Sequence, residues 1–446
     1  MSMNSPSRYI EIRPDNIPAN GKISFKNGFP VLSFSVSAQN GMLDPRSIRI
    51  VGEFSAFKDN LATPTPLTNG DHVTMNNRLG IYNVIDTLTV RSSRSKMICE
   101  SIRHYSKFMN TYLGLTSSAQ GDQLGHLSQT CLIQPNPTTF RKSVMESAFT
   151  AAPQTNSFSA HLPCGFVQSG NMIDLRPDAF GGIQIEMLLN PDSNVLFQLA
   201  GNSTGIGDAH YELSNLKLTC EIMSPGDTPP ASEGTFDFNT ITSLYTSINS
   251  TNAQIQYSLA LSKVQSAFMT FMPVSNINTL TQDGQATTYP SGVGTSDTAL
   301  AAIRRVQFLK GGVKYPADFD YVANIEEVGN ESSQLPDPQI IKGLMDAVLP
   351  NYGMTRTSIS PANMNRDYNM TTSITGEFSY NNIPLGGSVM GIGVKYGLGG
   401  GEDFSMEQFG VSIDSQLTAD NPIGVYIFIK SGARLVYNKN GVQVIQ

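Results

Sequence analysis

Two stretches of this chain share one pattern, GIQIEMLL at residues 182–189 and GVSIDSQL at residues 410–417. Each has Gly, then Ile or Val, any residue, Ile, an acidic residue, two further residues and Leu. The apolar side chains alternate with polar ones over much of both stretches, which is typical of a strand with one buried face. The stretches begin at residues 182 and 410 of a 446-residue chain, so their spacing is close to half of its length. This spacing predicts that one folding unit occurs twice.

Further sequence similarities appear in the same order in both halves. Helical spacing of apolar residues predicts one helix over residues 94–113 and another over residues 337–349. The stretch FSAHLPCG follows the first helix at residues 158–165, and FSYNNIPLGG follows the second at residues 378–387. Because these similarities keep one order, we interpret the chain as a tandem duplication.

A stretch with the composition of a linker separates the halves. It has the sequence MSPGDTPPASEG at residues 223–234 and is rich in Pro, Gly and Ser. A chain of this length also exceeds one ordinary core and suits two domains of about 200 residues each. We therefore expect two domains, residues 1–224 and residues 225–446.

The composition predicts a mostly β protein. Charged residues make up 15% of the chain, against about 25% in an average soluble protein, and 39 Gly and 25 Pro favour short elements joined by turns. Strand-like runs dominate, among them YELSNLKLTCEIM at residues 211–223. Near the C-terminus we expect short strands separated by turns at SGA (431–433) and NKNG (438–441).

These features together predict a fold class. An all-β unit of this size with a single helix suits a jelly roll, in which two four-stranded sheets pack face to face. We therefore expect an all-β fold of two tandem eight-stranded jelly rolls, with one main helix inserted in each. Residues 114–139 and 276–300 are predicted loops, and loops of this length in a compact domain are usually functional surfaces.

Charge and cysteine usage limit the environment and partners. The net charge is −7, which argues against nucleic-acid binding over the whole surface but leaves a local basic face open. Four scattered cysteines without a CxxC motif favour a reducing compartment. The N-terminus lacks the apolar run of a signal peptide, and no segment reaches 18 apolar residues, so we expect no membrane span.

The side chains show no pattern typical of an enzyme. The five histidines lack the HxH and HxxxH spacings of metal-binding jelly rolls. The Gly-rich GLGGGED at residues 397–403 has no Lys to neutralise a phosphate and no helix pattern after it, and no GxSxG pentapeptide occurs. We therefore expect no catalytic residues, no metal site and no cofactor.

Three stretches resemble one protein family. They are YELSNLKLTCEIM at residues 211–223, RRVQFLKGGVKYP at residues 304–316, and PIGVYIFIKSGARLVYNKNGVQVIQ at residues 422–446. With the tandem all-β plan, they make the chain resemble the double jelly-roll major capsid proteins of tailless icosahedral DNA viruses. It is most similar to those of virophages and polinton-like viruses. The resemblance covers most of the chain.

The resemblance implies a structural protein. In this family three chains form a homotrimer with six jelly rolls in a ring, and this pseudo-hexagonal capsomer tiles an icosahedral capsid. The implied partners are other copies of the chain, penton proteins and minor capsid proteins. The implied location is the virion capsid, after synthesis and assembly inside an infected host cell.

The loop at residues 276–300 is a candidate contact surface. It contains Asp283, Tyr289, Pro290 and Gly294, few apolar residues and almost no charge, so it has no core of its own. We expect it at the outer end of the second jelly roll, where Tyr289 would anchor it against another chain of the trimer.

A second candidate surface lies in the region of the first predicted helix. Arg94, Lys96, Arg103 and Lys107 occur there against a single acid, Glu100. Such a basic face either contacts acidic partner subunits or faces packaged DNA through phosphate contacts.

Two other interpretations remain open. One is a two-domain jelly-roll protein that binds or hydrolyses glycans, and the other is a minor capsid component. The chain has no Trp, on which sandwich-fold lectins often stack sugar rings, and this disfavours the first alternative. A penton protein usually needs only one jelly roll, so the duplication favours the major capsid protein.

Overall fold

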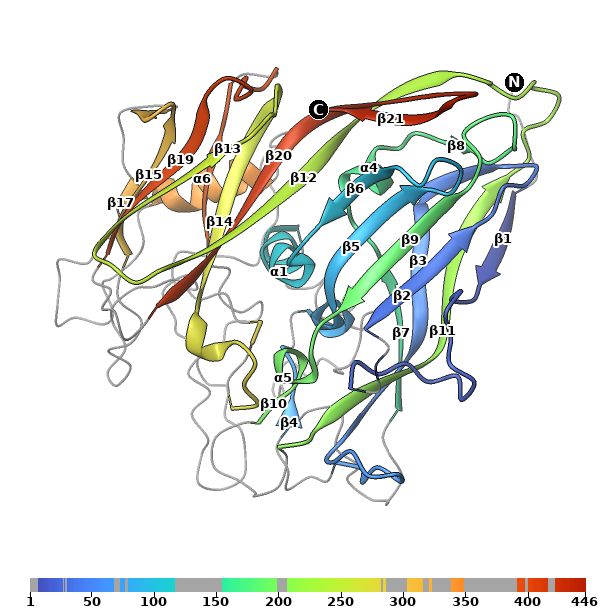
Figure 1. Ribbon diagram of the computed structural model, residues 1–446, viewed down its shortest axis with the longest axis horizontal. Helices are drawn as coiled ribbons and strands as arrows, with labels where there is room; N and C mark the ends of the chain where they lie inside the picture. Colours follow the sequence, from blue (N-terminus) through green and yellow to red (C-terminus); the bar gives the residue numbers. More distant parts are fainter. Residues whose placement is uncertain are drawn as a thin grey trace.

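The structure is a computed structural model that describes residues 7–26, 28, 30–67, 73–76, 79–116, 155–198, 207–281, 284–285, 303–315, 321–322, 338–348, 391–397, 400–415 and 422–446. Figure 1 shows two β-sandwiches side by side, with helix α1 (Tyr105–Thr116) between them. Each described strand of the four main sheets pairs only with strands on its own side of residues 224–233. The strands before this segment form the first jelly roll, and those after it form the second.

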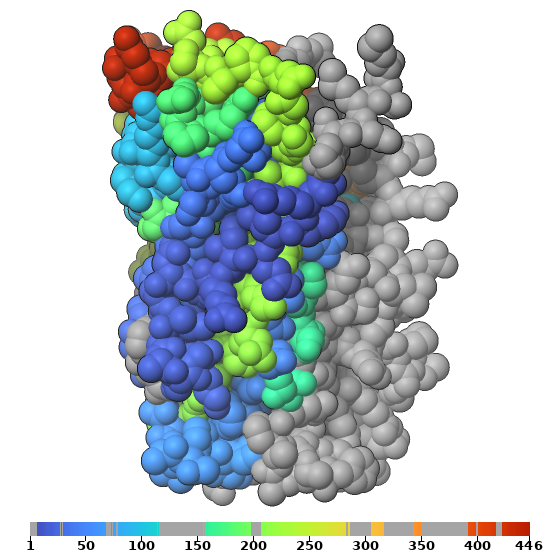
Figure 2. Space-filling view, turned by 90° about the vertical axis from the view of Figure 1, so that its right-hand side faces the viewer, coloured from blue at the N-terminus to red at the C-terminus, as the bar shows by residue number. Residues whose placement is uncertain are grey.

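The first jelly roll contains two main sheets and a short ribbon. One sheet has the order β1 (Ser7–Ile12), β11 (His210–Met223), β3 (Met42–Phe57) and β7 (Thr155–His161), with β8 (Ile173–Asp174) also paired to β3. The other has the order β2 (Val31–Val36), β9 (Ile183–Leu189), β5 (Ile85–Ser92) and β6 (Ile98–Ile102). The ribbon pairs β4 (Val73–Thr74) with β10 (Phe197–Gln198). Figure 2 shows the outer face of this half, where β1 lies beside β11.

The second jelly roll also contains two main sheets. One has the order β12 (Gly234–Ile248), β20 (Ile423–Asn438), β14 (Val264–Pro273) and β18 (Ile392–Lys395), with β21 (Gly441–Ile445) also paired to β20. The other has the order β13 (Asn252–Ser258), β19 (Gln408–Ser415), β15 (Ile303–Lys310) and β16 (Val313–Lys314), with β17 (Tyr321–Val322) also paired to β15. The described helices besides α1 are η1 (Gly80–Val84), α4 (Gly165–Gln168), α5 (Asp192–Val195), η3 (Val274–Asn276) and α6 (Pro338–Val348).

The two halves have the same strand order. The sheet β1-β11-β3-β7 corresponds strand by strand to β12-β20-β14-β18, and β2-β9-β5-β6 corresponds in the same way to β13-β19-β15-β16. In each half the chain passes repeatedly from one antiparallel sheet to the other, which is the arrangement of a jelly roll. The predicted fold class, all-β with two tandem jelly rolls, is confirmed.

The repeated stretches occupy equivalent strands. GIQIEMLL contains β9, which lies between β2 and β5, and residues 410–415 of GVSIDSQL belong to β19, which lies between β13 and β15. Ile185 and Ile413, the shared isoleucines, are 0% and 1% exposed. Complete burial of such a side chain contributes about 1.5–3 kcal/mol, so each repeat helps to hold one core together.

Strand β11 shows why its apolar pattern skips a position. Leu213 and Leu216 are both buried although they lie three positions apart, whereas Leu218 and Ile222 follow the ordinary period of two. The pairing with β3 shifts between Ser214 and Lys217, and Asn215 between them has a φ of 51°. This β-bulge restores the inward direction of the following side chains.

The prediction of a helix over residues 94–113 is wrong for its first part. Residues 98–102 form β6, which pairs with β5, and the helix begins only at Tyr105. Lys96 and His104 have φ values of 59° and 53°, so the chain reverses before β6 and turns again before α1. The apolar residues at helical spacing are therefore divided between a strand and a helix.

The predicted turn at SGA (431–433) is also wrong. Strand β20 continues through these residues and pairs with β12 at Ser431↔Thr240 and Gly432↔Asn239. Hydrogen bonding to a long neighbouring strand therefore overrides the local turn signal of Ser and Gly. The turn predicted within NKNG (438–441) is present between β20 and β21.

The predicted helix over residues 337–349 is confirmed by α6. Its inward residues Leu344 and Val348 are 1% and 7% exposed, and the Ser266 hydroxyl on β14 donates a 2.6 Å hydrogen bond to the carbonyl of Ala347. FSYNNIPLGG at residues 378–387 lies outside the described residues, as does most of the predicted loop at 114–139.

Candidate functional site, the seam between the two jelly rolls

The two jelly rolls meet along a seam formed by β6, α1 and α4 of the first and by β12, β14 and β20 of the second. Helix α1 lies in this seam (Figure 1), and both α1 and α6 contact the sheet β12-β20-β14-β18. A seam of this kind sets the distance and angle between the two sandwiches. It is therefore the structural site on which the shape of the whole chain depends.

The centre of the seam is aromatic. Phe108 on α1 lies with its ring centroid 6.2 Å from that of Phe268 and 5.7 Å from that of Phe428, on β14 and β20. Phe108 is only 6% exposed, so the contact removes most of a large apolar side chain from water.

A second aromatic cluster joins the jelly rolls near α4. The ring of Phe166 lies 5.7 Å from Phe236 and 5.6 Å from Phe238, both on β12. The ring of Phe180 lies 6.4 Å from Phe236 and 5.6 Å from Tyr437 on β20. The seam is therefore packed with apolar rings over two separate regions.

A buried carboxyl group bridges the seam between these regions. Glu100 on β6 accepts a 2.7 Å hydrogen bond from the backbone N–H of Phe166 and a 3.0 Å hydrogen bond from the backbone N–H of Ile241. Its side chain thus contacts both jelly rolls while the residue is 3% exposed. Burial raises the pKa of the Glu100 carboxyl above its ordinary value, and the hydrogen bonds from the two N–H groups act in the opposite direction.

The same region requires a glycine. A Cβ atom on Gly165 would lie 1.4 Å from the carbonyl oxygen of Asn239 on β12. The backbones of the two jelly rolls therefore approach each other more closely than any residue with a side chain would allow.

Two residues of the predicted outer loop, Gly284 and Gln285, are held in the seam. The Lys107 ammonium donates to the carbonyl oxygen of Gly284 and lies 5.6 Å from the centroid of the Tyr426 ring. Ser106 donates a 2.8 Å hydrogen bond to the side chain of Gln285, and Asn110 donates a 2.9 Å bond to its carbonyl. Helix α1 of the first jelly roll therefore holds Gly284 and Gln285 in place.

A histidine, His104, contacts both jelly rolls in the seam. His104 lies 3.7 Å from the Asp86 carboxylate, and its ring centroid is 5.6 Å from that of Tyr245 and 5.0 Å from that of Tyr426. The left-handed backbone of His104, uncommon for a residue with a side chain, places its ring between the two jelly rolls.

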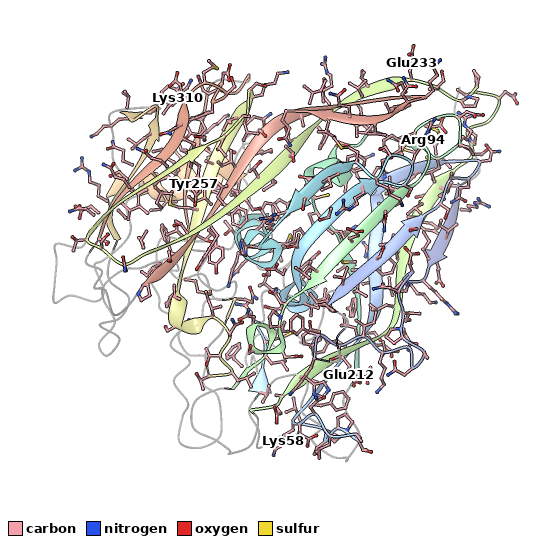
Figure 3. All side chains as sticks on the ribbon, in the orientation of Figure 1. Lys58, Arg94, Glu212, Glu233, Tyr257 and Lys310 are labelled. Carbon is pink, nitrogen blue, oxygen red and sulfur yellow. The ribbon has the colours of Figure 1, made fainter. Side chains whose placement is uncertain are left out.

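The four basic residues singled out in the sequence are not all at the surface. Arg94 and Lys96, before β6, and Arg103, after it, are exposed, whereas Lys107 is buried. Arg94 donates to the carbonyl of Lys439 in the second jelly roll at 2.7 Å, and Figure 3 shows it on the side of the first jelly roll near β21.

Lys107 does not belong to an exposed basic face. It is 4% exposed and contacts the second jelly roll of its own chain. Arg103 is exposed, and Lys96 reaches the side chain of Gln184 at 3.4 Å. The candidate loop contacts Asp283, Tyr289, Pro290 and Gly294 lie outside the described residues.

No sequence pattern marks the seam residues as a group. The one available signal is that Glu100 is a single acid in a basic stretch. Within the described ranges, no group of three His, Cys, Asp or Glu side chains is placed to hold a metal ion. No described helix is both long and apolar enough to cross a membrane.

Comparison with known proteins shows the fold. Neither a protein-family model nor a curated protein sequence matches the chain. Solved structures match it over nearly its whole length. The protein VP54 of PBCV-1, in a crystal structure fitted into a reconstruction of the virophage Sputnik, is 10% identical, with a TM-score of 0.55 over 99% of this chain and 97% of that one.

Two further structures give similar values. A quasi-atomic model of the PBCV-1 capsid is 9% identical, with a TM-score of 0.54 over 99% of this chain and 97% of that chain. The Faustovirus major capsid protein is 11% identical, with a TM-score of 0.55 over 97% of this chain and 90% of that one. The chain therefore shares the fold of these proteins from end to end.

Proposed function

We propose that this chain is a major capsid protein, which forms homotrimers that tile the icosahedral capsid of a DNA virus. The observation that carries the proposal is that two jelly rolls of equal strand order are joined side by side by a buried seam. A unit of two similar lobes, repeated three times about an axis, has six lobes and an outline close to a hexagon. Such an object tiles a surface although its true symmetry is threefold.

The likeness to capsid proteins supports the proposal. One matched structure is named as a major capsid protein of Faustovirus, and another is a capsid of PBCV-1. Because the match covers almost all of each chain, it includes both jelly rolls and their arrangement. The function proposed depends on this arrangement and on no catalytic group.

The proposal includes contacts that sequence analysis indicated. We place the division between the two domains, residues 1–224 and 225–446, in the segment between β11 and β12. Asp283, Tyr289, Pro290 and Gly294 are proposed as contacts between chains of the trimer. Penton proteins, minor capsid proteins and packaged DNA are proposed as further partners, with Arg94, Lys96 and Arg103 as the exposed members of the basic set.

Native mass measurement tests the proposal. A trimer of three 48.3 kDa chains has a mass of about 145 kDa, and light scattering on the purified protein should show this mass or larger assemblies. Electron microscopy of the same sample should show particles with threefold symmetry and six lobes. A protein that stays monomeric over a wide range of concentration and salt would contradict the proposal.

A further inference from the structure

A groove of about 1520 Å³ lies between the two jelly rolls. It is lined by residues of β3, α1 and α4 from the first jelly roll and of β12, β14 and β20 from the second. Helix α4 and the C-terminal part of β20 lie toward the end of the molecule where Figure 1 marks both termini. Arg94, Lys96 and Arg103, the exposed basic residues named above, do not line the groove, so it is a separate surface.

Positive charge dominates the ionisable side chains of the groove. Four cations line it: Arg46 on β3, Lys263 before β14, and Lys430 and Arg434 on β20. Among the described lining residues, Asp237 is the one carboxylate side chain, and Arg434 donates hydrogen bonds of 2.7 and 3.0 Å to it. Arg46 pairs at 3.5 Å with Asp44, which is not a lining residue. Four cations thus meet two carboxylates here, although the whole chain has a net charge of −7.

Two of these cations have no carboxylate partner. Within the part of the chain that the structure describes, neither Lys263 nor Lys430 forms a salt bridge. Lys263 is exposed, whereas Lys430 is half-buried. Burial lowers the pKa of the Lys430 ammonium, because water solvates the charge less well there. An anion that enters the groove would therefore stabilise both charges.

The groups that reach the open space of the groove are mostly polar. The rings of Phe108, Phe238 and Phe268 are at most 6% exposed, so they offer no open surface to an apolar side chain or to a nucleic-acid base. Ile445 is the one large apolar side chain that is exposed among the described lining residues. Hydroxyl and amide side chains, such as that of the exposed Ser262, accompany the cations. Arg, Lys, Ser and Gln side chains are groups that bind the phosphates of nucleic acids.

This surface suits a duplex better than a peptide or a single strand. An extended peptide is usually held by open apolar pockets or by a free sheet edge, but the groove's phenylalanines are buried and β20 pairs with strands on both sides. A single strand would gain little, because its bases would have no aromatic surface on which to stack. A duplex keeps its bases stacked on one another and presents its phosphates outward, so it needs only cations and polar groups.

We propose that the groove binds the phosphate backbone of a nucleic-acid duplex through contacts that do not read the base sequence. The exposed Arg46, Lys263 and Arg434 contact phosphate oxygens, and the charge of Lys430 adds to the attraction. Binding releases counterions from the duplex, so its affinity depends steeply on salt. The inference rests on the proposed function in taking packaged DNA as the partner, but the binding itself does not require a trimer.

Fluorescence anisotropy with the full chain tests this inference. The probe is a short labelled DNA duplex, and duplexes of a second sequence, a single strand of equal length and a labelled poly-Glu peptide serve as comparisons. Inorganic tripolyphosphate is added as a competitor. We expect the two duplexes to bind equally and more tightly than the other probes. A plot of log affinity against log salt concentration should have a slope of about −3, since about four cations are available.

Two variants locate the binding. Lys263→Met and Lys430→Met each keep the aliphatic stem and remove the charge, and the exposed position of Lys263 makes its replacement safe for the fold. Each variant should weaken duplex binding about fivefold to tenfold and reduce the size of the salt slope by about one. Lys58→Met is the matched control, because Lys58 is half-buried like Lys430 but lies at the opposite end of the molecule (Figure 3). It should change neither the affinity nor the slope.

Four outcomes would overturn the inference. They are no binding of the duplex, a single strand or poly-Glu peptide that binds as tightly as the duplex, displacement of the duplex by tripolyphosphate at an equal concentration of phosphate groups, and a salt slope that neither lysine variant changes. The native mass of the same sample separates this inference from the capsid proposal. Trimers that bind no duplex would contradict only the inference, whereas a strict monomer that binds the duplex would contradict the capsid proposal.

Discussion

The Glu100 carboxylate on β6 of the first jelly roll accepts a 3.0 Å hydrogen bond from the backbone N–H of Ile241 on β12 of the second. Among the described strands, β12 pairs only with β20, so its other edge carries backbone groups that need partners. Glu100 supplies one partner, and Asn171 supplies another by donating a 3.1 Å hydrogen bond to the carbonyl of Asp237. The first jelly roll therefore caps an edge that would otherwise be open to another strand.

Replacement of Glu100 by Gln should change how stability depends on pH. Burial raises the pKa of Glu100 in the folded protein, so the folded state holds this proton to a higher pH than the unfolded chain does. Above the folded pKa, the ionised group lowers stability, and this cost disappears as pH falls through that pKa. The free energy of unfolding of the natural protein, relative to Glu100→Gln, should therefore rise as pH is lowered from neutral.

Urea unfolding at several pH values measures this difference. Glu233→Gln, at an exposed position shown in Figure 3, controls for the loss of one carboxylate. If the stability difference between the natural protein and Glu100→Gln instead falls as pH is lowered, the hydrogen bonds outweigh burial and the assigned direction of the pKa is wrong.

Replacement of Gly165 by Ala should force the jelly rolls apart. The new Cβ would lie 1.4 Å from the Asn239 carbonyl oxygen, a backbone atom that moves only with its strand. We expect a loss of about 3 kcal/mol in the free energy of unfolding, at the upper end of ordinary overpacking. Gly207→Ala is the control, since nothing lies within 4 Å of the Cβ it would add. Equal stability of the two variants would contradict the close approach described at Gly165.

Replacement of Phe108 by Ala should weaken the seam by removing its central ring. Loss of a buried phenylalanine typically costs about 3–5 kcal/mol, and Phe108→Leu should cost less because it leaves a smaller cavity. Limited proteolysis should then cut residues 224–233 faster in the Ala variant, because separation of the jelly rolls exposes this segment. If unfolding and proteolysis are both unchanged, the packing of Phe108 against Phe268 and Phe428 does not hold the two jelly rolls together.

Replacement of Ile185 by Asp should unfold the first jelly roll. An unpaired charge at a position that is 0% exposed should cost at least 3 kcal/mol. Leu188→Asp, on the same strand but 39% exposed, should cost about 1 kcal/mol or less. Circular dichroism during thermal unfolding distinguishes the two. Similar melting of both variants would mean that β9 does not present Ile185 to the core.

Much of the fold was predictable because it depends on local patterns. The alternation in β9 and β19 identifies buried strands, and the spacing of Leu344 and Val348 identifies α6. The error over residues 94–102 has a physical cause: apolar residues at helical spacing also suit a short strand when β5 offers hydrogen bonds. The turn predicted at SGA failed in the same way, because β12 supplies a partner along the whole of β20.

Periodicity and order are properties of the chain, so the amino acids alone are enough to predict that this protein consists of two similar β units. How those units are joined depends on tertiary contacts. Helices α1 and α6 arise at equivalent points, yet α6 packs on its own jelly roll while α1 also packs on the other one. Glu100 and Gly165 have their roles because Ile241 and Asn239, remote in sequence, lie beside them. Such roles depend on contacts between segments that are distant in the sequence, so a local sequence pattern cannot predict them.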